Sequence, residues 1–150
     1  MKHRKNVNSN ILFRKKGELK MMKDINYDEV LMNYAKEVMK NAYSPYSHFQ
    51  VGAALLTGKG TVYTGCNVEN SSFGATICAE RNAIFQAIAN GEQDFVKIAI
   101  YCSENRFPIP CGMCLQVMQE FNDDIEIILS DHTSIKKYKL KDFLPIQFKL

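Results

Sequence analysis

The stretch that decides the fold begins at Cys78, ends at Phe121 and reads CAERNAIFQAIANGEQDFVKIAIYCSENRFPIPCGMCLQVMQEF. Apolar residues recur at helical spacing over residues 78–90, and the glycine that follows ends that run. Residues 95–102 are a nearly unbroken apolar run, which predicts a buried strand, and residues 111–121 again predict a helix. The stretch therefore predicts a strand between two helices, with a cysteine at the start of each helix.

The segments on either side extend this pattern. Helical spacing of apolar residues predicts another helix over residues 27–39. Strand signals occur at residues 49–56, 61–67, 125–129 and 138–140. The glycines on either side of Lys59 mark a hairpin turn between the first two strands, and residues 69–76 read as a loop. The order helix, hairpin, helix, strand, helix, strand predicts an α/β fold in which helices cover a mixed sheet.

The net charge of +3 comes from the N-terminal end. Residues 1–23 carry eight basic side chains and one acidic side chain, whereas residues 24–150 carry eleven basic and fifteen acidic ones. A nucleic-acid-binding surface needs basic residues gathered on the folded domain. The acidic body therefore argues against a nucleic-acid partner, with a basic arm at the N-terminus as the remaining alternative.

Residues 1–22 have no clean periodicity and little to bury, so we interpret them as a disordered basic extension before one domain over residues 23–150. An alternative is a reading frame that starts at Met21 or Met22. The five cysteines are an odd number, and the N-terminus lacks the apolar core of an export signal. No apolar run is long enough to cross a membrane. We therefore expect a cytoplasmic chain without a membrane partner, in which clustered cysteines bind metal rather than form disulfides.

Three cysteines lie at the two predicted helix starts. Cys111 and Cys114 are one turn apart on the same face of their helix, and Cys78 opens the earlier helix. Unpaired N–H groups and the positive end of the helix dipole favour the thiolate form, which is the form that binds metal. Three thiolates suit tetrahedral zinc with the fourth position open for water, so we expect one catalytic zinc ion per chain.

Glu80 follows the first of these cysteines by two residues, so it can lie beside the metal without binding it. A carboxylate there can move protons between water and substrate. The C-x-x-C pair alone could also be structural zinc, a redox pair or two buried thiols. The two motifs together match the three-cysteine signature of zinc deaminases, in which the glutamate is not a ligand. We interpret Cys66 and Cys102 as buried thiols and His48 as a non-ligand.

From about Tyr27 to Phe148 the sequence resembles the small homotetrameric cytidine deaminase family. The segments that carry the resemblance are YSPYSHF (residues 43–49), VGAAL (51–55), GCNVEN (65–70), CAER (78–81) and PCG-x-C (110–114). The resemblance implies a three-layer cytidine deaminase fold, a zinc cofactor, a homotetramer and a role in pyrimidine salvage.

The resemblance also implies roles for individual residues. Asn67 and Glu69 match the pair that holds the ribose hydroxyls. Phe49 matches the aromatic residue that packs against the pyrimidine, and Ala79 matches a backbone contact to the base. Arg81 matches a residue that donates hydrogen bonds to the zinc thiolates. Without the resemblance, Phe49 and Phe148 would be interpreted as ordinary core packing and Arg81 as a solvated helix charge.

Two aromatic residues are expected to act between subunits. Phe148 resembles a C-terminal aromatic residue that reaches an active site in the tetramer. Phe73 stands where many members have a tyrosine near the 5′ end of the ribose. Two further departures are Met113, where alanine is usual, and Leu115, where arginine is usual. If that arginine offsets the charge of three thiolates, its loss should raise the pKa of bound water unless another cation substitutes.

The sequence thus predicts hydrolytic deamination of cytidine and deoxycytidine to uridine and deoxyuridine, with release of ammonia. Zinc held by the three cysteines supplies hydroxide for attack at C4, and Glu80 moves protons to N3 and to the departing ammonia. A deaminase of another aminopyrimidine, such as blasticidin S, is one alternative. A non-catalytic zinc protein is another, although a structural site would close its fourth position with a protein ligand. A nucleic-acid-editing enzyme would need a basic strand-binding channel, which the acidic body does not favour.

Overall fold

The computed structural model describes residues 26–149. The elements are α1 (Tyr27–Met39), β1 (Val51–Thr57), β2 (Val62–Cys66), the 3₁₀ helix η2 (Phe73–Ala75), α2 (Ala79–Ala89), β3 (Phe95–Cys102), α3 (Gly112–Phe121), β4 (Glu126–Ser130), β5 (Ile135–Lys139) and α4 (Leu140–Phe143). The long helices and the first four strands lie where the sequence predicts them, within two residues at each end. The predicted order of elements is confirmed.

The C-terminal end differs from the prediction. The expected weak strand at residues 138–140 is instead β5, which begins at Ile135, and α4 follows it directly. β5 has the sequence IKKYK, and its three lysines leave no clear alternation of apolar and polar residues from which to predict a strand. α4 is a single turn, and the Asp142 carboxylate accepts a hydrogen bond from the Lys139 N–H at 2.7 Å. An element this short has no periodicity to detect.

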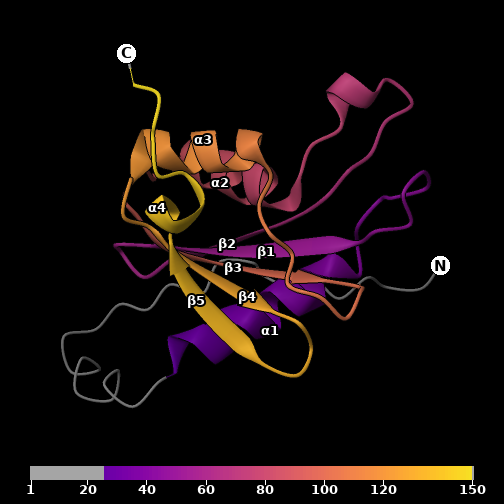
Figure 1. Ribbon diagram of the computed structural model, residues 1–150, viewed down its shortest axis with the longest axis horizontal. Helices are drawn as coiled ribbons and strands as arrows, with labels where there is room; N and C mark the ends of the chain where they lie inside the picture. Colours follow the sequence, from indigo (N-terminus) through magenta and orange to yellow (C-terminus); the bar gives the residue numbers. More distant parts are fainter. Residues whose placement is uncertain (1–25, 150) are drawn as a thin grey trace.

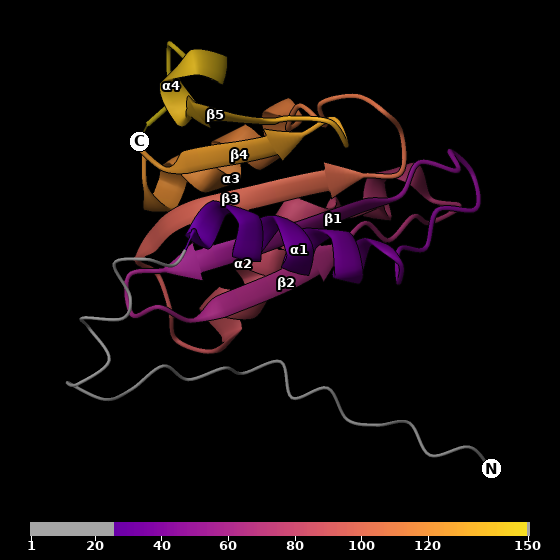
Figure 2. The same ribbon diagram turned by 90° about the horizontal axis from the view of Figure 1, so that it is seen from below.

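The strands form one mixed sheet in the order β2-β1-β3-β4-β5. β1 pairs antiparallel with β2 and β3, β3 pairs parallel with β4, and β4 pairs antiparallel with β5. Figures 1 and 2 show α3 as part of the crossover between the parallel strands β3 and β4. This crossover places the start of α3 beside the start of α2, because both helices pack on the same face of the sheet.

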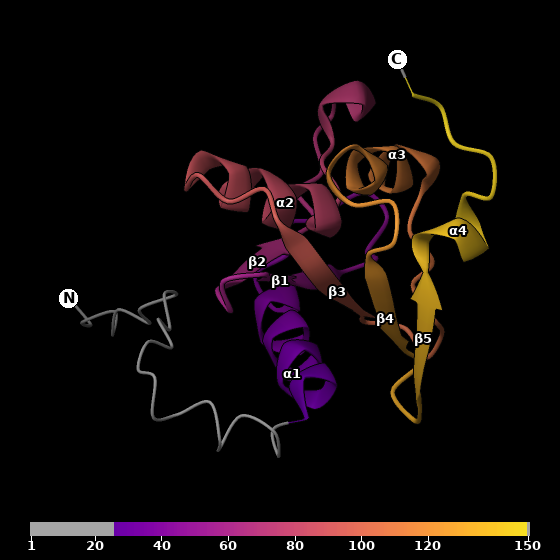
Figure 3. The ribbon, with the colours of Figure 1, turned by 90° about the vertical axis from the view of Figure 1, so that its left-hand side faces the viewer.

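Helices cover both faces of the sheet, as expected. Figure 3 shows α1 against one face and α2 with α3 against the other, and a buried apolar cluster fills each interface. Two glycines allow helices to lie close to the sheet, Gly52 of β1 beneath α1 and Gly65 of β2 beneath α2. A Cβ atom at Gly52 would collide with the Ala35 carbonyl oxygen of α1, and one at Gly65 would collide with the backbone of α2 at Ala83 and Ala79. These two glycines therefore determine how close α1 and α2 lie to the sheet.

The expectation of a disordered extension over residues 1–22 lies outside the described residues. Within residues 26–149, no helix is both long enough and apolar enough to span a membrane.

Candidate metal centre and active site

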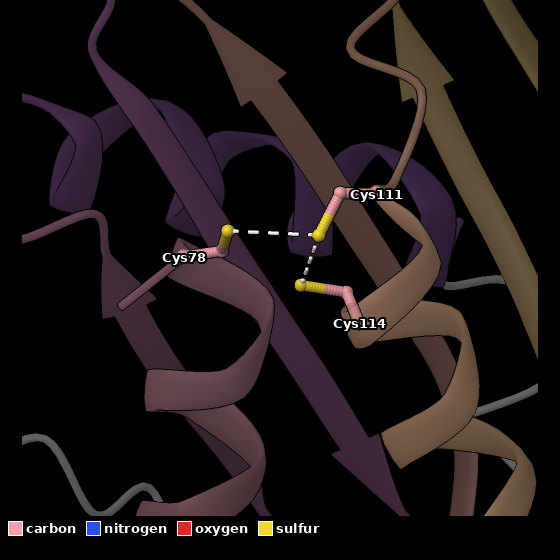
Figure 4. Close-up of side chains that lie close together, drawn as sticks. All are labelled: Cys78, Cys111 and Cys114. Atoms are coloured by element: carbon pink, nitrogen blue, oxygen red, sulfur yellow. Dashed lines mark hydrogen bonds between the residues drawn. The ribbon is translucent and has the colours of Figure 1, made fainter. Parts of the chain in front are cut away.

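The three cysteines predicted as ligands converge between α2 and α3 (Figure 4). Cys78 is the N-cap residue of α2, Cys111 is the N-cap residue of α3, and Cys114 lies in the first turn of α3. The Cys78 and Cys111 sulfur atoms are 3.9 Å apart, and the Cys111 and Cys114 sulfur atoms are 3.5 Å apart. All three sulfur atoms lie within 4.8 Å of one another. The described residues thus form a compact set of three soft donors at two helix starts.

This geometry fits a zinc ion. Zinc–thiolate bonds of about 2.3 Å in a tetrahedron place the sulfur atoms about 3.8 Å apart, which is close to the separations between these thiols. The sulfur atoms are too far apart for disulfide bonds, which need about 2.05 Å. Three thiolates leave the fourth tetrahedral position for a small molecule, as in catalytic rather than structural zinc sites.

Arg81 of α2 provides a cationic group beside the thiols. Its Nη2 donates to the Cys78 sulfur at 3.6 Å, and its buried Nε has no hydrogen-bond partner within residues 26–149. A hydrogen bond from the Cys114 thiol lowers the pKa of Cys78, and the Arg81 guanidinium adds to this effect. The lowered pKa favours the thiolate form of Cys78. The shared hydrogen bond raises the pKa of Cys114. The guanidinium is thus placed to offset the negative charge of a thiolate metal centre.

Glu80 lies in the first turn of α2 and is almost completely buried, with 5% of its surface exposed. Burial raises the pKa of its carboxyl group to about 7, and the nearby Cys78 thiolate adds to this effect. A carboxyl group that titrates near neutral pH can both accept and release a proton. Because Glu80 lines the same pocket as Cys78 and Cys111, it can exchange protons with a molecule bound there.

The pocket has a volume of about 360 Å³, which is the lower part of the range for small-molecule sites. Its lining contains five residues expected to act there, namely Phe49, Asn67, Glu69, Ala79 and Glu80, together with two of the expected metal ligands, Cys78 and Cys111. These residues come from the loop before β1, the segment after β2, the start of α2 and the start of α3. The structure thus brings together residues that lie far apart in the sequence.

Asn67 and Glu69 are both held by hydrogen bonds within the chain. The Asn67 side chain accepts from the Val51 N–H at 2.8 Å and donates to the Phe49 carbonyl oxygen at 2.8 Å. The Glu69 carboxylate accepts from the Tyr46 and Ser47 N–H groups at 2.9 and 3.2 Å and from the Ser47 hydroxyl group. The hydroxyl hydrogen bond lowers the pKa of Glu69. Both side chains are therefore fixed before any ligand binds, and the carboxylate is ionised.

Phe73 and Phe148 do not line this pocket. Phe73 lies in η2 with 75% of its surface exposed, and its ring makes a T-shaped contact with the Tyr46 ring at a centroid distance of 5.9 Å. Phe148 is 66% exposed and borders a separate hollow beside α3. The Gln116 side-chain amide donates to the Phe148 carbonyl oxygen at 3.3 Å, which holds the C-terminal segment along α3. Their expected role concerns another subunit, so it stays a prediction.

The two other departures from the family pattern lie in different surroundings. Leu115 is buried in the core between the sheet and α3, so it belongs to the packing of that helix. Met113 is exposed at the start of α3.

Cys102 is buried, as expected, whereas Cys66 is only half-buried. His48 is not among the three residues of the cysteine cluster.

Several pocket residues were not identified from the sequence. They are Ser47, Val51, Thr76, Ile100, Arg106, Phe107, Pro108 and Ile109. Six of them lie in β1, in β3 or in the loop between β3 and α3. Nothing in their residue types distinguishes them from core or loop residues. Only the proximity of Phe107 and Arg106 to the C-x-x-C motif could have drawn attention to that loop.

Residues 25–129 match the family described as the cytidine and deoxycytidylate deaminase zinc-binding region. A cytidine deaminase from Halalkalibacterium halodurans is 42% identical over 122 residues, covering 80% of this chain and 92% of that protein. A cytidine deaminase from Mycobacterium tuberculosis is 37% identical over 129 residues, covering 86% of this chain and 94% of that protein. The crystal structure of cytidine deaminase from Burkholderia pseudomallei matches with a TM-score of 0.76 and 41% identity, over 80% of this chain and 98% of that chain. The chain therefore belongs to the zinc-dependent cytidine deaminase family.

Proposed function

We propose that this chain catalyses the hydrolytic deamination of cytidine and deoxycytidine to uridine and deoxyuridine. The observation that carries this proposal is the combination of three converging thiols with one buried carboxyl group in a single pocket. Water adds its oxygen to C4 of the base, the bond from C4 to the exocyclic nitrogen breaks, and that nitrogen leaves as ammonia. Membership of the family and the names of its relatives at 37–43% identity support this reaction.

Cys78, Cys111 and Cys114 would hold the zinc ion. When bound there, zinc would lower the pKa of a water molecule toward neutrality and make it a nucleophile. Glu80 would take a proton from that water and deliver it to N3 of the base. It would then carry a proton to the departing amino group. Its buried position beside the thiols suits this transfer, because the carboxyl group is protected from bulk water.

The other pocket residues would select a nucleoside. Glu69 is an ionised acceptor held in place by Ser47 and Tyr46, so it suits a ribose hydroxyl group. One N–H of the Asn67 amide remains after the hydrogen bond to Phe49 and could point to the same hydroxyl. The Phe49 ring would pack against the base, and the Ala79 backbone would contact it. Arg81 would offset the charge of the thiolates.

The proposal includes a homotetramer in which Phe73 and Phe148 close the active site of another subunit. Large apolar side chains remain exposed on the described chain around η2, α3 and the C-terminal segment, and they include Phe73, Met113, Ile146 and Phe148. Contact with another subunit would bury them. A closed site would exclude water that competes with the nucleoside.

A substrate panel tests this function. Purified, zinc-loaded protein should release ammonia from cytidine and deoxycytidine but not from cytosine, which lacks the ribose that Glu69 would bind. Turnover of blasticidin S without turnover of cytidine would instead establish the alternative deaminase. If no compound in the panel, including deoxycytidylate, releases ammonia while each chain retains one zinc ion, the chain is a non-catalytic zinc protein.

A further inference from the structure

Arg106 provides a positive charge on the wall of a pocket whose other ionisable groups are carboxylates and thiols. It is the one cationic side chain among the described residues that line the pocket. Its guanidinium carbon lies 4.6 Å from the centroid of the Phe49 ring, which is within range of a cation–π contact. Its Nε lies 2.8 Å from the Glu104 carboxylate. The carboxylate thus orients the guanidinium over the ring.

This contact joins two separate loops of the pocket wall. Phe49 lies in the loop before β1, and Arg106 lies in the loop between β3 and α3. Two hydrogen bonds join the same loops, one between backbone groups and one to a side-chain hydroxyl. The Ser103 N–H donates to the Gln50 carbonyl oxygen at 2.9 Å, and the Gln50 N–H donates to the Ser103 hydroxyl at 3.2 Å. These bonds fix the backbone beside Phe49, whereas Arg106 covers a face of the ring itself.

The backbone just before Phe49 has an unfavourable conformation. His48 has a φ of 57°, in the left-handed region that non-glycine residues rarely adopt. Its N–H donates to the Ser44 carbonyl oxygen at 3.0 Å, and the Phe49 N–H donates to the Ser47 hydroxyl at 3.0 Å. Such a conformation persists only where surrounding contacts enforce it. These two hydrogen bonds lie within the loop and fix its backbone, whereas the contact from Arg106 reaches the Phe49 ring from a different loop.

We propose that Arg106 is a positioning residue that holds the Phe49 ring in place for the base of the substrate. The inference rests on the proposed role of Phe49 in packing against the pyrimidine. Because the guanidinium covers one face of the ring, a ligand meets the other face or the edge. Packing of this kind stabilises the bound substrate and the transition state equally, so its loss raises KM and leaves kcat unchanged.

The test compares Arg106→Ala, Arg106→Lys and Lys59→Ala. Lys59 is a matched control, because it is also an exposed cation paired with a carboxylate, Glu92 at 3.1 Å, and it lies outside the pocket lining. Arg106→Ala should raise KM for cytidine roughly two- to five-fold, as expected for an exposed cation–π contact, with kcat unchanged. Arg106→Lys should recover part of this loss. Lys59→Ala should match the parent chain in both constants.

A double-mutant cycle separates positioning from a general effect of charge. If Arg106 acts through the ring, Arg106→Ala should cause no further rise in KM once Phe49→Leu has removed the ring. An equal effect in both backgrounds would overturn the proposal. A fall in KM would overturn it too, because the guanidinium would then occupy the place of the ligand.

A binding measurement distinguishes this inference from the proposed function. Calorimetric titration of cytidine into the Glu80→Gln chain, with and without Arg106→Ala, does not depend on turnover. Weaker binding on loss of Arg106 would support positioning even if the parent chain proved inactive on cytidine. Equal binding, or no binding by either chain, would contradict it.

Discussion

Each thiol at the metal centre is separately testable. Alanine at Cys78, Cys111 or Cys114 removes one sulfur donor, so zinc should fall from one ion per chain to nearly none. Cys66→Ala is the matched control, because this half-buried cysteine lies outside the cluster. Metal analysis of the purified chains checks the result. Stoichiometric zinc in the three cluster variants would refute the ligand assignment. Because metal binding and folding are coupled, aggregation of these variants alone would also be consistent with it.

The residues of this site differ in how well a sequence can reveal them. The C-x-x-C spacing of Cys111 and Cys114 predicts a metal site. Cys78 and Glu80 could be identified because they lie at a predicted helix start. Arg106 has no such signal, because its relation to Phe49 arises only when two distant loops meet. The left-handed backbone at His48 is also invisible in the sequence, since the residue there is not glycine. Residues whose roles come from the fold's topology could not be predicted from spacing alone.

At the scale of elements, the contact between β2 and α2 sets the position of the metal centre. Gly65→Ala would place a Cβ atom against the α2 backbone at Ala79 and Ala83, next to Cys78. The helix must then move, so we expect destabilisation by about 1–3 kcal/mol and weaker zinc retention under chelator challenge. Gly74→Ala is the control, because its added Cβ would meet open space. Unchanged melting temperature and zinc affinity in Gly65→Ala would contradict this account.

Helix α1 is joined to the sheet by a partly buried charge cluster. The Asp28 carboxylate lies 2.8 Å from the Lys97 ammonium of β3 and 2.5 Å from the Lys137 ammonium of β5. Burial opposes its ionisation, but hydrogen bonds from Lys137 and Lys97 outweigh that effect and hold its pKa below the usual value of 3.8. The stabilisation is therefore complete above the unfolded pKa of about 3.9 and is lost as the pH falls through the lower folded pKa.

We accordingly expect Asp28→Asn to lower the free energy of unfolding at pH 7 by about 2 kcal/mol, the scale of charged hydrogen bonds. Glu37→Gln on the same helix is the control and should cost less than about 1 kcal/mol, because its pair with Lys40 is exposed. Urea denaturation at pH 7 and below pH 3 measures both variants. The difference between the parent and Asp28→Asn should shrink at the lower pH. A constant difference would show that ionisation of Asp28 does not matter.

The elements were predictable where their periodicity is strong. α1, α2 and α3 have apolar residues at helical spacing and β3 is a nearly unbroken apolar run, and each element lies where its pattern predicts it. β5 and α4 were not predictable in full, because strand β5 is rich in lysine and α4 is a single turn stabilised by its neighbours. The order of the strands in the sheet could not be predicted either, because it depends on which strand edges pair after the helices pack.

At the scale of the whole molecule, the proposed sharing of sites between subunits predicts complementation. A Glu80→Gln chain lacks the proton carrier, and a Phe148→Ala chain lacks the ring that would close a neighbouring site. Mixed assemblies should contain some sites with both groups intact, so activity should exceed that of either variant alone. Sedimentation must verify that the subunits have mixed. A mixed assembly without recovered activity would reject site sharing through Phe148, and a fully active monomer would reject the homotetramer itself.

The central claim is that Glu80 moves protons beside a zinc ion held by three cysteines. The measurement that tests it most directly is the rate of ammonia release from cytidine by the parent chain and by Glu80→Gln at equal zinc content. Glutamine preserves the shape of the side chain but cannot carry a proton, so turnover should fall by about a hundred- to ten-thousand-fold while zinc and melting temperature are retained. A Glu80→Gln chain that keeps more than roughly a tenth of the parent turnover, well outside that range, would contradict the account.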